Sequence, residues 1–558
     1  MTGFSCVAVC GLALALAGCG GPAAPNSAPN PQAAAAGTEQ VTRIVEKYWD
    51  DRLPAENGIS PQYLADSLSI EHRYLAEILA VPRDALDAKT RLTYDIFRRR
   101  REVIVEGFTY PSELLPIDPI DGMPHDLAAY AAELAARPST KAADYENWLK
   151  RIDAYVRWTQ QAAVNMRDGV RRGYTSPRAL IERILPLLER LGADDPGNVF
   201  YGPIRSLPDG IQAADRAKLT RDMTSAVSQR LLPANRSLHD FLQKEYLPRA
   251  RAGLALSDLP LGNQWYAYRV RRATSSDLSP EEINRIGIAE VERLAPPAAR
   301  EAAAVSAPAG GLVNAYRELQ TQVQAALPMV VAEIPKSEFD IRAADWLPRP
   351  DMDLYYQARG ADGSPPAVLY VNTGKGARVA PSIAGFLQQG LPGHHFQSAI
   401  QQERMDLPRF RRFGVEPAFT EGWDLYASSL GEVLGVYNEE SAKMDAASAQ
   451  MRCAVALVVD TSLQAKGWTR AQAFDYLHAH LALDDLDAQL LIDSFAAKPG
   501  DALACIGEMK FRALRARAQQ GLGSRFDLRD FHSEILKDGA MPLDILETKM
   551  KAWMDAAK

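Results

Sequence analysis

The residues best suited to chemistry lie in one stretch of the C-terminal half of the chain. His394 and His395 are adjacent, and Glu421 follows His395 by 26 residues. A hydrolytic zinc site needs three protein ligands, an open position for water and a carboxylate that takes the proton of that water. The two histidines and Glu421 are therefore candidate metal ligands. On spacing alone, histidines at a helix end that hydrogen-bond to the backbone are the more common explanation.

Two glutamines stand shortly before the histidines, where the helix of a zinc hydrolase would carry a His-Glu pair. They are Gln388 and Gln389. A glutamine amide has no titratable proton and cannot act as a general base, and its oxygen is a poor zinc ligand beside imidazole. We therefore expect a lost ligand at Gln388 and a lost base at Gln389.

Other polar residues near this stretch have alternative explanations. Glu403 could replace the missing acid or ligand, but a solvated helix face beside Arg404 is the favoured explanation. Tyr426 and Tyr437 could donate to a developing oxyanion, although a tyrosine at such a position is more often part of the core. His478 and His480 are two residues apart on a predicted helix, so they face different directions and cannot form a ligand pair.

The elements that must position these side chains are mainly helical. Apolar residues recur at spacings of three and four in residues 145–166, 179–191 and 452–459, which predicts helices. Hydroxyl residues that precede helix starts, at Ser176, Ser279 and Thr469, predict N-caps, and the last two have Glu or Gln three residues on, as in a capping box. We expect one large helical body, with two lobes around a cleft as an open alternative.

A small β-sheet is expected near residues 350–372. Residues 353–356 and 367–372 are short, aromatic and β-branched, and Asp362-Gly363 between them is typical of a turn. The sheet shortly precedes the two glutamines, where an edge strand could line a substrate site.

The N-terminus predicts export and a lipid anchor. Residues 4–17 are apolar but too few to span a bilayer, and they end in Leu-Ala-Gly-Cys at residues 16–19. This motif resembles the lipobox of bacterial lipoproteins, so we expect a signal peptide over residues 1–18, lipidation of Cys19, a flexible tether to residue 37 and a folded domain over residues 38–558. A secretory signal with an incidental Cys19 is the alternative. The expected location is the bacterial cell envelope, lipid-anchored and facing the periplasm.

Charge and cysteine content narrow the partners further. The 63 basic and 70 acidic residues give a net charge of -7, which offers no basic field for nucleic acid, so we expect none as a partner. Cys453 and Cys505 are the cysteines that remain after Cys19. In an oxidising envelope they could pair, and two separate buried thiols are equally compatible with the sequence.

The mature chain resembles a bacterial family, domain of unknown function 885, whose members are placed among gluzincin-like zinc peptidase folds. The motifs that carry the resemblance are Pro-Gly-His-His at residues 392–395 and Glu-Gly-Trp at residues 421–423, together with Tyr-Gly-Pro-Ile at 201–204, Tyr-Val-Asn at 370–372, Val-Asp-Thr at 459–461 and Gly-Trp-Thr at 467–469. In the family pattern, His-Glu precedes Pro-Gly-His-His, and these two residues correspond to Gln388 and Gln389. A family histidine corresponds to Gln464, and an Arg-Tyr pair to Ser494 and Phe495.

The resemblance implies a metallopeptidase-like lipoprotein that is catalytically impaired. It implies His394, His395 and Glu421 as metal ligands, with zinc as a cofactor that has been weakened or lost, and Gln397 and Trp423 as retained positions. With Tyr426, these two are our candidates for contacts to a peptide or other envelope material. Two alternatives stay open, an active zinc hydrolase with an unconventional base and a structural or partner-binding lipoprotein. Because positioned acid-base groups are worth about a hundred- to ten-thousand-fold in rate, losing the pair favours the impaired protein.

Overall fold

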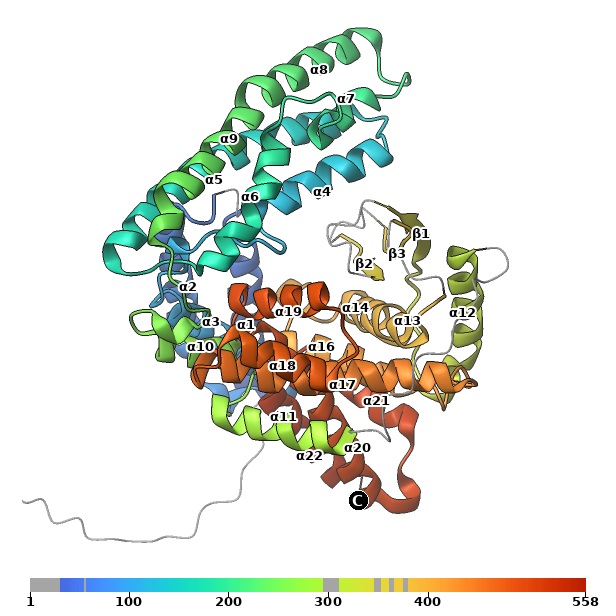
Figure 1. Ribbon diagram of the computed structural model, residues 1–558. Helices are drawn as coiled ribbons and strands as arrows, with labels where there is room; N and C mark the ends of the chain where they lie inside the picture. The colour runs from blue at the N-terminus through green and yellow to red at the C-terminus, as the bar shows by residue number, and fades with distance from the viewer. Residues whose placement is uncertain are drawn as a thin grey trace, which may run out of the picture.

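A computed structural model describes residues 31–54, 57–294, 311–345, 353–360, 366–374 and 380–557. Its helices form a large body and an arm that rises from it, shown above the body in Figure 1. The arm comprises α4 (Met123–Ala136), α5 (Ala142–Arg172), α6 (Arg178–Gly192), α7 (Gly202–Arg205), α8 (Ala213–Ala226) and α9 (Leu232–Phe241). The prediction of a mainly helical fold is confirmed.

The arm has an apolar core of its own. α5 buries one face along its whole length, with Trp148, Tyr155 and Met166 inside, because its apolar residues recur at helical spacing. α8 and α9 form the opposite wall and continue into each other through a π-helical segment, Val227–Leu231, and a second such segment, Leu242–Tyr246, follows α9. Among the described residues, the apolar core of the arm and the large apolar core of the body have no residue in common, so the two are packed separately.

The body surrounds the candidate site with long helices. Before the sheet it comprises α1 (Pro31–Asp51), α2 (Pro61–Leu79), α3 (Ala88–Gly107), α10 (Gly262–Thr274), α11 (Pro280–Leu294) and α12 (Leu312–Ala326). After the sheet come α13 (Ile383–Gln389), α14 (His394–Glu403), α15 (Arg409–Arg412), α16 (Pro417–Ser428), α17 (Glu440–Ala465), α18 (Arg470–His480), α19 (Asp485–Ala497), α20 (Gly507–Leu522), α21 (Leu528–Leu536) and α22 (Leu543–Ala556). α13, α14 and α16 contribute to one large apolar core together with α1, α3 and the sheet.

The predicted small sheet is present and has three strands. They are β1 (Asp340–Ala344), β2 (Leu354–Gln357) and β3 (Val368–Asn372), in the order β1-β3-β2. β3 is central, with β1 parallel and β2 antiparallel to it, and Tyr355 is paired with Tyr370. The sequence did not predict β1, in which Asp340 and Arg342 interrupt the apolar pattern of a strand. The predicted Asp362-Gly363 turn lies outside the described residues.

The predicted helix starts are confirmed in part. Ser279 and Glu282 form the expected capping box, and so do Thr469 and Gln472. Ser176 does not cap α6, which begins after Pro177.

At the N-terminus, α1 already begins at Pro31, so residues 31–37 of the expected tether are helical, and Cys19 and the expected signal lie outside the described residues. Within the described part of the chain, no helix combines the length and apolar character that a membrane span requires.

Candidate functional site

The candidate site is built around a tight turn between α13 and α14. The Ser382 hydroxyl caps α13 by accepting a hydrogen bond from the Gly385 amide, and the helix ends at Gln389. Gly393 then passes so close to α13 that a Cβ atom on it would lie 2.0 Å from the carbonyl oxygen of Gln388. Only glycine fits this approach, and it allows α14 to begin with His394.

Trp423 fixes this turn through a hydrogen bond to its backbone. Its indole is fully buried and donates a hydrogen bond of 2.8 Å to the carbonyl oxygen of Pro392. A ligand cannot reach a side chain in this position. The predicted contact between Trp423 and a substrate therefore has no support in the structure, and the residue positions the turn instead.

Of the two adjacent histidines, His394 is the one that remains partly accessible to solvent. Its Nδ1 donates a 2.7 Å hydrogen bond to Oδ2 of Asp424, a buried residue of α16. Burial opposes the charged imidazolium, but the charge and hydrogen bond of Asp424 outweigh it, so the pKa of His394 is raised. The second oxygen of Asp424 is also buried, and no described atom hydrogen-bonds to it. The pair leaves Nε2 of His394 free to contact a ligand.

Glu421 lies one turn before Asp424 on α16 and is exposed, although the residues from Gly422 to Ser428 are all buried. The protein around its carboxyl group is nevertheless dense enough that desolvation, and then the charge of Asp424, raises its pKa to about 7, while His394 opposes the shift. The pKa values of Glu421 and His394 are thus both raised, and each group acts on the other through its charge.

His395 has a structural environment. Its Nε2 donates to the carbonyl oxygen of Ser337 at 3.0 Å, and its Nδ1 accepts a 2.9 Å hydrogen bond from the Tyr356 hydroxyl. Burial lowers its pKa to about 4, so the ring is neutral at physiological pH. Because both nitrogens are occupied, His395 offers no lone pair to a metal in this arrangement.

Gln388 and Gln389 are half-buried at the C-terminal end of α13. Neither side-chain amide hydrogen-bonds to any residue that the structure describes. Both amides are therefore available to a ligand as donors and acceptors.

Three further candidate residues lie in the core or in a loop contact. Gln397 is buried and donates to Gln401 at 2.7 Å. The Tyr426 hydroxyl is buried and donates to Nε2 of His532 at 2.8 Å. Glu403 accepts hydrogen bonds from the amides of Lys336 and Ser337, which fixes the loop before β1. Gln397 and Tyr426 thus bond within the protein, and at Glu403 the structure shows a loop contact where a solvated helix face was expected.

The residues present do not complete a zinc site. His394 offers Nε2 and Glu421 a carboxylate, and the Asp424 contact is the outer-shell support that a ligating histidine usually has. A hydrolytic zinc needs a third protein ligand, which His395 cannot supply while both its nitrogens are bound. No group of three His, Cys, Asp or Glu side chains in the described residues has the arrangement of a metal centre.

Comparison with known proteins places the chain in a family. Residues 32–550 match the family described as "Bacterial protein of unknown function (DUF885)". The chain belongs to this family. A search of curated proteins found no match.

Solved structures show where this fold has been seen before. A candidate lipoprotein from Colwellia psychrerythraea has a TM-score of 0.79 at 21% identity, covering 94% of this chain and 100% of that one. A candidate lipoprotein of unknown function from Shewanella oneidensis has a TM-score of 0.61 at 14% identity, covering 93% and 99%. A carboxypeptidase from Pyrococcus furiosus, at 10% identity and covering 95% and 100%, reaches a TM-score of only 0.29, which carries no argument. The gluzincin-like fold stays a prediction.

Gln464 and Phe495, two positions at which the resemblance implies a departure from the family pattern, contact each other. Gln464 is buried on α17, accepts a hydrogen bond from the Leu256 amide and donates one of 3.0 Å to the carbonyl oxygen of Phe495 on α19. The amide therefore joins three segments of the body. In this protein the position stabilises the fold and does not face the candidate site.

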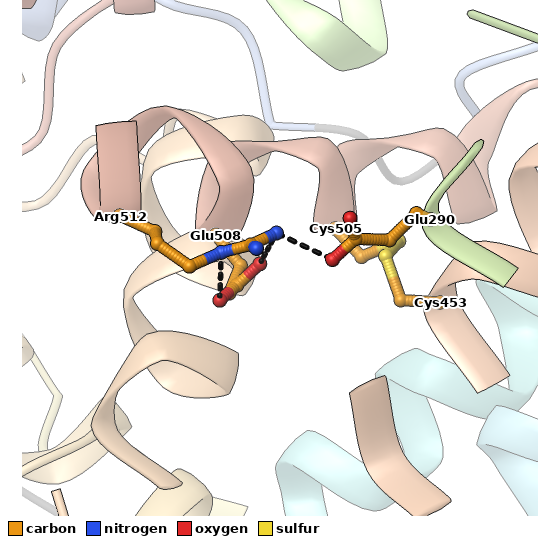
Figure 2. Close-up of a disulfide and its surroundings, with 5 residues drawn as sticks. All are labelled: Glu290, Cys453, Cys505, Glu508 and Arg512. Carbon is orange, nitrogen blue, oxygen red and sulfur yellow. Dashed lines mark hydrogen bonds and ion pairs between the residues drawn. A yellow bond between two sulfur atoms is a disulfide. The ribbon is translucent and has the colours of Figure 1, made fainter. Parts of the chain in front are cut away.

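A disulfide holds the segment that leads into the helix packed against α16. Cys453 of α17 is bonded to Cys505, close to Glu290, Glu508 and Arg512 (Figure 2). Of the two arrangements that the sequence left open, the structure shows the paired one. The bonded segment leads directly into α20, whose first residue, Gly507, packs against Gly422 of α16. The disulfide thus fixes the surface on which the helix of Glu421 and Asp424 rests.

Proposed function

We propose that this protein is a lipid-anchored envelope protein that binds peptides, or similar envelope material, beside His394 and Glu421 and has lost efficient zinc-dependent hydrolysis. One observation carries the proposal. An accessible His394 and Glu421 adjoin a helix end with two neutral, unpartnered amides, Gln388 and Gln389, where catalysis would need a ligand and a base.

The sheet supplies a place for an extended ligand. β2 lies at the edge of the described sheet, and its residue Tyr356 bonds to His395 and places its ring 5.3 Å from that of His394. An edge strand presents unpaired backbone groups to which an extended peptide can add as a further strand. A peptide paired with β2 would run past His394.

The remaining catalytic power is expected to be small. Without a carboxylate at position 389, no side chain matches the usual base, which alone is worth about a hundred- to ten-thousand-fold in rate. Binding does not require that base. The amides of Gln388 and Gln389 can instead hydrogen-bond to peptide groups of a ligand.

The proposal of a membrane anchor is supported by the N-terminal motif and by the descriptions of similar proteins. Leu-Ala-Gly-Cys at residues 16–19 resembles a lipobox, and the two solved structures with TM-scores of 0.79 and 0.61 are described as candidate lipoproteins. The Cys453–Cys505 disulfide is also what an oxidising compartment favours. Together these support an envelope location with Cys19 as the lipidated residue.

The test uses equilibrium dialysis of the mature protein against a random octapeptide mixture, with bound and cleaved peptides identified by mass spectrometry. We expect retention of a subset of intact peptides, lost in His394→Asn and Glu421→Gln. His480→Asn and Glu432→Gln, both exposed and outside the site, are matched controls that should bind as the wild type does. Retention that is equal in all variants would refute the site, and absence of binding would favour a purely structural lipoprotein.

An active zinc hydrolase is the second candidate. It is favoured by the raised pKa of Glu421, about 7, since a general acid or base works best when its pKa is near the operating pH. This function requires His395 to exchange its hydrogen bond with Tyr356 for a metal. Cleavage in the same dialysis experiment that depends on added zinc and is abolished in Glu421→Gln would establish it.

A further inference from the structure

We infer that the arm is a hinged lid and that the contact between Arg137 and Tyr370 is the latch that holds it over the sheet. Arg137 directly follows α4 as its C-cap residue, and Tyr370 is in the central strand β3. The guanidinium of Arg137 lies 4.6 Å from the centre of the Tyr370 ring and also donates a hydrogen bond to its hydroxyl. Figure 1 shows α4 running above the strands.

The sheet has two different faces. Ile341, Leu369 and Val371 belong to the large core of the body. On the other face, Ala344, Val368 and Tyr370 cluster with Tyr355, and this cluster includes no apolar residue of the arm among those described. The arm therefore approaches this face through a polar contact and not through a packed apolar interface.

Among the described residues, ion pairs also join the arm and the body elsewhere. Arg183 of α6 pairs with Asp493 of α19, and Lys498 pairs with Asp118 and Asp121 just before α4. Polar interfaces between separately packed lobes favour relative motion. Apolar packing occurs at the base of the arm instead, where Tyr174 contacts Trp265. Apolar contacts at the base of the arm and a polar contact at the end of α4 are what a hinge at the base and a releasable contact at the far end require.

The latch is connected to the strand beside the candidate site. The Tyr370 hydroxyl donates a 3.1 Å hydrogen bond to Oε1 of Gln357, the last residue of β2. The adjacent residue, Tyr356, contacts both histidines. Opening of the arm would therefore uncover one face of the sheet and remove the arginine that orients the Tyr370–Gln357 pair.

The lid is testable without any ligand, so its failure is separable from that of the proposed peptide binding. Spin labels on Ala217→Cys in α8 and Gln322→Cys in α12, both exposed positions, report the distance between arm and body by pulsed electron resonance. In the otherwise unchanged protein we expect one compact distance distribution. In Arg137→Ala we expect a second, longer population, with the ratio of open to closed arm raised about tenfold, equivalent to about 1.4 kcal/mol.

Two further variants make the result specific. Tyr370→Phe removes the hydroxyl but keeps the ring under the guanidinium, so it should produce a smaller shift in the same direction. Arg151→Ala is the matched control, because Arg151 lies 4.3 Å from the centre of the Tyr130 ring, a contact made entirely within the arm. An unchanged distribution in Arg137→Ala, or an equal shift in Arg151→Ala, would overturn the inference.

Discussion

Replacement of Trp423 by phenylalanine should loosen the turn that presents His394. The change keeps an aromatic ring in a cluster with Tyr426, Phe511 and His532 but removes the donor that bonds to the Pro392 carbonyl. A buried polar group that loses its partner costs about 1–3 kcal/mol. If this cost falls on local opening of the turn, amide protection there should drop by about 5- to 150-fold.

Hydrogen exchange followed by mass spectrometry over residues 390–400 measures this directly. Trp468→Phe is the matched control, since Trp468 is half-buried against Tyr476 and lies outside the site. Protection at the turn should be unaffected by the control. Equal protection in wild type and Trp423→Phe, or the same loss in the control, would show that the indole does not position the turn.

Three further predictions concern the pH dependence of stability, the disulfide and the titration of His395. Burial lowers the pKa of His532 from 6.5 to about 3. The neutral ring therefore contributes fully to the free energy of unfolding above about pH 6.5. As the pH falls toward 3, this contribution is lost at up to about 1.4 kcal/mol per pH unit. Thermal unfolding between about pH 6 and pH 4 should therefore depend less steeply on pH in His532→Gln, and an unchanged slope would contradict this. Replacing both Cys453 and Cys505 by serine removes a disulfide with a sequence separation of 52, which should lower the free energy of unfolding by about 4 kcal/mol. The double variant should therefore unfold at a lower temperature than the wild type. An unchanged unfolding temperature would indicate that the bond does not constrain the unfolded chain. Tyr356→Phe removes the donor to Nδ1 of His395, so the ring should titrate differently by NMR while the far-UV circular dichroism stays the same, and an identical titration would argue against the bond.

The sequence predicted the features that depend on local pattern. The helices over residues 145–166, 179–191 and 452–459 lie within α5, α6 and α17, because helical spacing of apolar residues directly reflects burial on one face. The capping boxes at Ser279 and Thr469 are confirmed for the same reason, since both partners lie within one turn.

Contacts between distant segments could not be predicted in this way. Asp424 follows Glu421 closely, but nothing in its spacing shows that it bonds to His394, 30 residues earlier. The occupation of both nitrogens of His395 depends on Tyr356 and Ser337, which lie on segments before α13. A carboxylate one turn after a candidate ligand was the one available signal for Asp424.

Zinc stoichiometry of the wild-type protein and of the double variant Gln388→His with Gln389→Glu tests the central claim most directly. Both mature proteins would be equilibrated with zinc, desalted and measured by elemental mass spectrometry. We predict well under one zinc per chain for the wild type and close to one for the variant, in which the imidazole introduced at position 388 would join His394 and Glu421 as a third ligand. One tightly held zinc per chain in the wild type, or no gain in the variant, would contradict the proposed loss of the metal centre.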